Sequence, residues 1–421
     1  MLILAEGGLA VTTPDRRTLV TALCGSVGAA VLFALACPPF GFSAAAWAVP
    51  GLLLVTARRL TNRQAFEAGL LFGILSAALI ARWLPESIEL GLQVSPLVAS
   101  LLAYGVVSLV VGVPSGLMTM GYAFASRRVS RADLPIVGTF FWLGSEWIRA
   151  QFLGWELLGH TQFRELWLIQ IADLGGVFAV SFVVVLVSLS VAELASGGLG
   201  RHLPVRHALR RLALPLATLI VAFAYGADAR LLYRAAPVAA SVAEIGAVRD
   251  RSAQVVPVSL SSVANIGRPE LHVRQISTVG HSGIKVGPVL CRDLLDQHLV
   301  HRLVAGGADV LISNCRVPWL ADANSGASEQ HLALAVFRAV ESRRFLVRST
   351  NSGDSQLVTA VGATRTEPPR GESLTISNRM SHYVRWGDHW ILAGFGLAMI
   401  VTGRGRRQGA RDDRLGDPRQ D

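Results

Sequence analysis

The sequence predicts a polytopic α-helical membrane bundle of about eight spans, with a soluble α/β domain inserted before the last span. Three observations lead to this fold class. Of the 421 residues, 52% are hydrophobic and 16% are charged, whereas about a quarter of a typical soluble domain is charged. Apolar stretches of about 20 residues, the length that crosses a hydrocarbon core, recur in the first half. Between residues 283 and 362 the pattern changes to alternating short strands and helices.

Seven candidate spans precede residue 230, and an eighth follows the soluble segment. They cover residues 19–37, 43–57, 65–84, 96–124, 135–150, 174–195, 212–228 and 389–403. We therefore expect an N-terminal membrane domain over 1–230, a soluble domain over 231–388, and a final span with a basic tail over 389–421.

Arginine clusters predict the orientation of these spans. Lys285 is the only lysine, so the formal net charge of +10 rests on arginine. Clusters at 16–17, 58–63, 127–131, 201–211 and after 403 border alternate spans, whereas the opposite loops hold Arg82, Arg149 and Arg164. This is the pattern of positively charged cytoplasmic loops and not of a nucleic-acid-binding surface. We expect both termini in the cytoplasm, the soluble domain outside it, and a first span that is retained and not cleaved as a signal peptide.

The soluble segment has the pattern of a parallel sheet. In chain order it is expected to contain a strand ending at Cys291, a helix at 292–305, a strand at 308–314, a helix at 329–344, and strands at 345–351 and 355–361. The first three of these elements make a βαβ unit. Binding sites in such sheets form at the carboxyl ends of the strands, where Cys291, Asn314 and Asn351 fall.

Cys291 is the candidate nucleophile. It stands directly before a helix, where backbone N–H groups and the helix dipole stabilise a thiolate. A small buried residue is the alternative interpretation. The four cysteines are too few and too scattered for a disulfide scaffold or a zinc site, so we expect no metal and no cofactor. Cys315 ends the neighbouring strand about 5 Å away, close enough for a disulfide with Cys291.

Several stretches of the chain resemble the apolipoprotein N-acyltransferases, membrane enzymes with an eight-helix bundle and a nitrilase-like domain. The matching stretches are ACPPFGFSAAAWAVPGLLL (36–54), WLGSEWIRAQFLGWELLGH (142–160), IQIADLGGVFAVSF (169–182), VGPVLC (286–291), GGADVLISN (306–314), EQHLALAVFRAVESRRFLVRSTNSGDSQLV (329–358) and YVRWGD (383–388). The resemblance implies a nitrilase-like soluble domain, here shortened, on a protein of the bacterial inner membrane.

The resemblance also implies a Glu–Lys–Cys constellation with Cys291 at the nucleophile position. Such a cysteine attacks a phospholipid ester, holds the acyl chain as a thioester, and passes it to the amino group of a lipoprotein's diacylglyceryl cysteine. The implied partners are a phospholipid acyl donor, a lipoprotein acceptor and the membrane. No nucleic acid is expected, and the chain is expected to be a monomer.

The glutamate and the lysine of that constellation have no clear match. Lys285 lies in the same predicted strand as Cys291, about 20 Å away. The remaining candidates for the carboxylate are Asp293, shortly after the nucleophile, and Glu270 in GRPEL, ahead of Glu244. An arginine, Arg292 or Arg316, could replace the lysine as an oxyanion donor. The candidates for the substrate pocket are Arg292, Asn314, Trp319, Asn351 and Ser355.

Two other functions remain open. A membrane protein that keeps this fold but has lost turnover could bind lipid or lipoprotein without acylating it. An amidase acting on a small soluble amide is disfavoured, because nitrilase chemistry needs the same missing glutamate and lysine.

The helix predicted at 329–344 carries three polar residues at helical spacing: His331, Arg338 and Glu341. Residues in this arrangement are more often packing or helix-end contacts than members of a site. We therefore expect them to lie outside the site.

Overall fold

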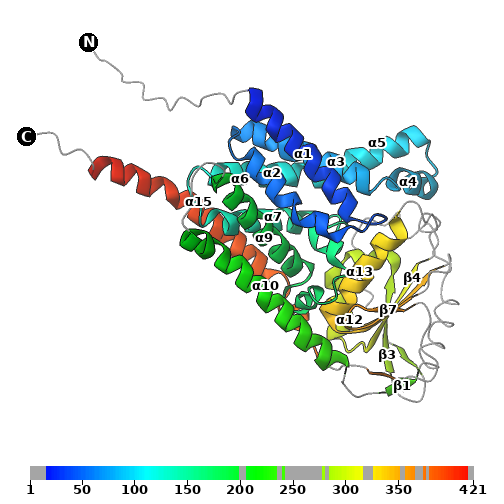
Figure 1. The fold of residues 1–421 in the computed structure, drawn as a ribbon. Coiled ribbons are helices and arrows are strands. Elements are labelled where there is room, and N and C mark those ends of the chain that lie inside the picture. Colours follow the sequence, from blue (N-terminus) through cyan, green and yellow to red (C-terminus); the bar gives the residue numbers. More distant parts are fainter. Residues whose placement is uncertain are drawn as a thin grey trace, which may run out of the picture.

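The computed structural model describes residues 16–198, 205–234, 239–241, 277–279, 284–315, 326–350, 356–365, 373–375 and 379–415. A helical bundle forms one part of the molecule and a mixed sheet lies against one end of it, with helix α13 (Ala327–Ser342) between them (Figure 1). Helix α1 (Arg16–Ala36) begins, and α15 (His389–Leu415) ends, at the end of the bundle away from the sheet (Figure 1).

The bundle consists of apolar helices that pack closely. Its other helices are α2 (Val49–Ala57), α3 (Asn62–Ile80), α4 (Leu84–Leu92), α5 (Pro96–Val107), α6 (Val113–Ala125), α7 (Leu134–Ala150), α8 (Ala172–Gly175), α9 (Val177–Gly198) and α10 (Val205–Arg234). A π segment, η2 (Ser108–Gly112), joins α5 to α6. A Cβ built on Gly69 of α3 would clash with the carbonyl oxygen of Ser115 in α6. The two helices therefore approach backbone to backbone, as small residues allow in membrane bundles.

Five of the described helical stretches are long and apolar enough to span a membrane. They cover Arg16–Ala36, Asn62–Ile80, Pro96–Ala125, Val177–Ser196 and Arg211–Tyr233. The predicted span at 43–57 is interrupted, because a 3-10 turn, η1 (Ser43–Trp47), precedes α2. The predicted span at 135–150 is the 17-residue α7, and the last predicted span is the first part of α15. Length and composition thus support fewer spans than expected, and the count of eight stays a prediction.

Among the residues that the structure describes, the main sheet has six strands in the order β2-β3-β4-β5-β6-β7. These strands are β2 (Ser277–Val279), β3 (Ile284–Leu290), β4 (Val310–Cys315), β5 (Phe345–Thr350), β6 (Gln356–Val358) and β7 (Thr364–Arg365). A separate pair joins β1 (Ala239–Ser241) to β8 (Ser373–Thr375). Strands β3, β4 and β5 run parallel; β2 pairs antiparallel with β3, β6 pairs antiparallel with β5, and β7 pairs antiparallel with β6.

The predicted βαβ unit is confirmed, but its helix is shorter than the expected 292–305, because a 3-10 turn separates Cys291 from it. Strand β3 leads through a 3-10 turn, η6 (Cys291–Leu295), and helix α12 (Gln297–Ala305) into the parallel strand β4, and α13 then leads into β5. The strand registers pair Leu290 with Asn314 and Asn314 with Ser349, so the parallel strands end at one edge. The strand predicted at 355–361 is shorter, because a turn with Gly362 at φ +83° follows β6.

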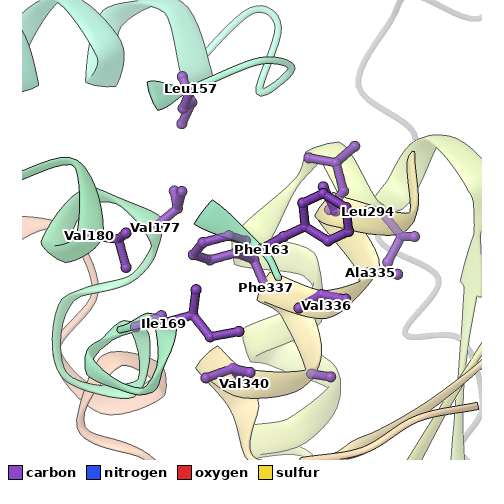
Figure 2. Packing of buried hydrophobic residues seen from close by; sticks show 14 of the residues in the cluster. Leu157, Phe163, Ile169, Val177, Val180, Leu294, Ala335, Val336, Phe337 and Val340 are labelled. Atoms are coloured by element: carbon purple, nitrogen blue, oxygen red, sulfur yellow. The ribbon is translucent and has the colours of Figure 1, made fainter. Parts of the chain in front are cut away.

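Helix α13 packs against both the helical bundle and the sheet. Nearly all of its side chains are buried. One hydrophobic cluster joins them to apolar residues of the sheet and of the bundle. Figure 2 shows part of this cluster, with side chains of α13 next to side chains of the bundle segments: Val336, Phe337, Val340, Phe163 and Ile169. The sheet and the bundle therefore share a hydrophobic core instead of being joined only by the chain.

Candidate active site

Cys291 stands where the sequence predicts, at the carboxyl edge of the parallel strands. It is the first residue of η6, directly after β3, and it is half-buried. The carboxylate of Asp293 accepts a hydrogen bond from the backbone N–H of Leu290 at 2.8 Å. Arg292 Nε lies 3.8 Å from the same carboxylate. Asp293 therefore holds the turn that carries the sulfur.

The imidazole of His331 lies against the sulfur of Cys291. Its Nε2 is 3.3 Å from Sγ and 3.1 Å from the backbone carbonyl oxygen of the same cysteine. His331 is 1% exposed. The expectation that His331 lies outside the site is therefore wrong. Arg338 and Glu341, in contrast, pair with each other in the core at 3.0 Å, as expected of packing residues.

Arg348 of β5 contacts His331 from the other side. Its Nε donates to Nδ1 of the imidazole at 3.2 Å, and its Nη2 donates to the carbonyl oxygen and the hydroxyl of Ser328 at 3.0 and 2.8 Å. Burial of a guanidinium is costly unless it is hydrogen-bonded, and Arg348 is 1% exposed. These contacts explain how a strand that begins with three apolar residues accommodates a buried arginine. They make a continuous series from Arg348 through His331 to Cys291.

The bundle contributes Trp155 to the site. Its ring centroid lies 6.3 Å from that of His331 and 4.9 Å from that of Trp83. Both indole N–H groups donate to Oε1 of Gln330, at 2.8 Å from Trp83 and 3.0 Å from Trp155. The amide of Gln330 donates in turn to the carbonyl oxygen of Pro38 at 2.9 Å. Gln330, the neighbour of His331 on α13, therefore joins the site to three segments of the bundle.

Lys285 lies at the opposite end of β3 from Cys291. A Cβ built on Gly307, in the turn before β4, would be 3.6 Å from the Lys285 ammonium. The backbone N–H of Lys285 donates to Asp309, at the start of β4. This placement agrees with the prediction that Lys285 cannot reach the thiol.

Most of the other predicted site residues lie outside the described part of the chain. These are Glu244, Glu270, Arg316, Trp319, Asn351 and Ser355. Asn314 is placed by its backbone pairing with β3 and β5, while its side chain and that of Cys315 are outside the described set. The disulfide between Cys291 and Cys315 and the pocket role of Asn314 stay predictions. Among the side chains that the structure describes, no group of three His, Cys, Asp or Glu could hold a metal ion.

His331 and Arg348 are the site residues that sequence analysis missed. The signal for Arg348 is its position inside FLVRST, because an arginine on a buried strand is rare unless it has partners. His331 offers no such signal, since an imidazole that contacts a sulfur has the same helical spacing as one that packs. Whether His331 contacts the sulfur depends on how α13 packs against the sheet. This packing joins segments far apart in the sequence, so local spacing does not show it.

The YVRWGD stretch ends in another buried polar cluster. Asp388, which follows helix α14 (His382–Trp386), accepts hydrogen bonds from Trp147 Nε1 at 3.2 Å and Gln297 Nε2 at 2.8 Å. Its other oxygen accepts from the hydroxyl of Tyr383. The carboxylate thus joins α7 of the bundle to α12 and α14.

Comparison with known proteins finds similar sequences for part of this chain. A model of the apolipoprotein N-acyltransferase N-terminal domain matches residues 29–190. An apolipoprotein N-acyltransferase of Geobacter metallireducens is 31% identical over 218 residues, which are 51% of this chain and 40% of that protein. The matched part of this chain is similar to the apolipoprotein N-acyltransferases.

Other apolipoprotein N-acyltransferases match shorter stretches. That of Rhodopirellula baltica is 42% identical over 72 residues, 16% of this chain and 13% of the relative. That of Gloeobacter violaceus is 33% identical over 119 residues, 26% of this chain and 22% of the relative. The matched parts therefore span less than half the length of each of these relatives.

The residues that match the apolipoprotein N-acyltransferase domain include the bundle residues next to the site. The stretches at 36–54, 142–160 and 169–182, on which the resemblance rests, all lie within it. The same region holds Pro38, Trp83 and Trp155, whose contacts with Gln330 are described above. The matched domain thus supplies the wall against which α13 and its histidine pack.

Proposed function

We propose that this protein transfers an acyl chain from a phospholipid to the amino group of a lipoprotein's diacylglyceryl cysteine, with Cys291 as the nucleophile. In the first step the Cys291 thiolate attacks the ester carbonyl carbon. A carbon–sulfur bond forms, the ester carbon–oxygen bond breaks, and the lysophospholipid leaves with the proton that the thiol lost. In the second step the acceptor amine attacks the thioester. A carbon–nitrogen bond forms, the carbon–sulfur bond breaks, and the amine proton is released as the thiolate returns.

The position of Cys291 is the observation that carries this proposal. A half-buried sulfur follows a parallel strand at the sheet edge where binding sites of α/β sheets form. An imidazole nitrogen lies 3.3 Å from that sulfur, and a tryptophan of the bundle lies next to the imidazole. The relatives named apolipoprotein N-acyltransferase support the same chemistry.

We also propose where each part of the chain lies relative to the membrane. The bundle, over 1–230 and 389–403, would lie in the bacterial inner membrane, with both termini cytoplasmic and a nitrilase-like domain over 231–388 in the periplasm. The arginine clusters on alternate loops support this orientation. The placement of the start of α1 and the end of α15 away from the sheet also supports it (Figure 1).

Incubation of the purified full-length protein with a phospholipid labelled in its acyl chain tests the proposal. We expect a hydroxylamine-sensitive adduct on Cys291, found by peptide mass spectrometry and lost in Cys291→Ala. Cys24→Ala, at an exposed position of α1, is the matched control and should keep the adduct. Without any adduct on Cys291, a protein that binds lipid or lipoprotein without acylating it becomes the better explanation.

A further inference from the structure

Contacts on opposite sides of the His331 ring decide which nitrogen carries the proton. The backbone carbonyl oxygen of Cys291, which can only accept a hydrogen bond, lies 3.1 Å from Nε2. The Nε of Arg348, which can only donate, lies 3.2 Å from Nδ1. A neutral imidazole with a proton on Nε2 and none on Nδ1 satisfies both contacts. Every other protonation state loses at least one of them.

We infer that His331 is a hydrogen-bond donor to the Cys291 sulfur and not its general base, and that Arg348 is the positioning residue that keeps it so. This inference rests on the proposed role of Cys291 as the nucleophile. The Nε2–H group lies between the carbonyl oxygen at 3.1 Å and Sγ at 3.3 Å. When the sulfur ionises, the N–H group stabilises the thiolate, because hydrogen bonds to charged acceptors are the stronger ones.

This arrangement is the reverse of the one in which an imidazole removes a thiol proton. A general base needs an unprotonated nitrogen facing the sulfur, and an acceptor on the far side of the ring that holds the proton there. Here a guanidinium N–H occupies the far side of the ring. Arginine does not give up its proton in proteins, so Nδ1 remains an acceptor. The thiol proton must therefore leave to another group.

Burial keeps this orientation of the ring. His331 and Arg348 are each 1% exposed, and Ser328 holds the guanidinium in place. In such surroundings an unmade hydrogen bond is costly, which opposes a flip of the ring. The described charged side chains on η6 are Arg292 and Asp293. Those on α13 are Glu329, with its partner Arg164, and the pair of Arg338 and Glu341, while Glu156 lies beside Trp155.

The rate at which iodoacetamide alkylates Cys291 tests the inference on the full-length protein in detergent, with peptide mass spectrometry as the readout. His331→Ala is expected to lower the rate at pH 7 about ten-fold, because the loss of a hydrogen bond to the thiolate makes the reactive thiolate form less stable. His331→Gln keeps a side-chain N–H donor and is expected to restore most of the rate.

The pH profile of alkylation separates the positioning role of Arg348 from a purely structural one. In the unchanged protein the rate is expected to rise in one step, as the thiol ionises. Arg348→Met opens Nδ1 to protonation, and the profile gains a second step on the acid side from an imidazolium–thiolate pair. Arg348→Lys keeps a donor and is expected to retain the single step.

Two other cysteines serve as internal references. Cys24 is exposed and should react equally in all variants, whereas Cys37 is fully buried and reacts only if the fold opens. An unchanged Cys291 rate in His331→Ala, with Cys37 still protected, would overturn the inference. An acid-side step already present in the unchanged protein would do the same.

If His331→Ala opens the fold, the His331→Gln rate and the Arg348→Met profile decide instead. Alkylation needs no phospholipid and no acceptor. A failure of the acyl-adduct experiment therefore leaves this measurement intact, and the two proposals can fail separately.

Discussion

The two ends of helix α13 hold their buried polar side chains in different ways. Directly after its C-terminal end, Arg343 forms an ion pair with Asp173 at 2.8 Å. Near its N-terminal end the contacts are directed hydrogen bonds, from Arg348 to His331 and from His331 to Cys291. Arg343 also donates hydrogen bonds to Asp173 and Gln170, so its contacts combine opposite charges with several directed bonds. The imidazole of His331 is oriented by single N–H groups, and such bonds weaken steeply with angle. The comparison indicates that one end holds the helix in place and the other orients a single N–H group.

Replacement of Asp173, the acidic partner of Arg343, is expected to have the largest effect on stability. Arg343 has a side chain 0% exposed, and it also donates to Gln170. Asp173→Asn leaves the guanidinium without its counter-charge, and breaking a buried pair in this way costs about 3–5 kcal/mol. Thermal unfolding in detergent measures the loss. Glu67→Gln, in the exposed pair with Arg63, is the control and should change stability by less than about 0.5 kcal/mol.

If Asp173→Asn unfolds at the same temperature as the unchanged protein, the C-terminal end does not depend on its ion pair. The comparison between the two ends would then fail.

Glu341, near the C-terminal end of α13, is expected to make the stability of the protein depend on pH. Burial raises the pKa of this carboxyl from 4.5 to about 7, although Arg338 acts to lower it. Because the folded-state pKa is the higher one, the folded protein binds more protons than the unfolded chain in this range. The protonated Glu341 carboxyl therefore adds up to about 3 kcal/mol to the free energy of unfolding. This stabilisation is complete below pH 4.5 and is lost as the pH rises through about 7.

Unfolding midpoints measured from pH 4 to 8 in detergent check this prediction. Glu341→Gln cannot ionise, so its profile should be flatter over the same range. A pH dependence that Glu341→Gln leaves unchanged would assign the effect to other groups.

At the N-terminal end, Gln330→Leu is expected to have a smaller effect on stability and a distinct effect on reactivity. It removes the acceptor that Trp83 and Trp155 share, a loss of about 1–3 kcal/mol. Since Trp155 packs beside His331, the alkylation rate of Cys291 should change as well. Asp173→Asn, measured below its unfolding temperature, should leave that rate unaltered. Equal effects of the two variants on Cys291 would remove the distinction between the ends.

Local patterns were enough to predict the elements that carry the site. The helix expected at 329–344 is observed over 327–342, and the strand that ends before Cys291 is β3. Both depend on short-range periodicity, which a sequence displays directly. The spans were harder to predict, because mean hydropathy does not show where a run such as 43–57 breaks into a turn and a new helix at Pro50.

The contacts of the site depend instead on segments far apart in the chain. His331 meets a sulfur 40 positions away, and Trp155 meets Gln330 across 175 positions. Arg348 reaches the imidazole only because α13 folds back onto β5. The spacing of residues within one helix or strand does not show contacts between segments so far apart in the sequence. The sequence alone therefore did not distinguish a histidine that contacts Cys291 from one that only packs.

The place of α13 between sheet and bundle has a consequence for biosynthesis. The ribosome makes α1 to α10 before it reaches residue 327, yet the bundle segments around Phe163 and Ile169 pack against this later helix. A nascent chain in which α1 to α10 have formed still exposes the apolar surface that α13 later covers. Packing of the bundle is therefore complete only when α13, made late in translation, has folded against segments made early.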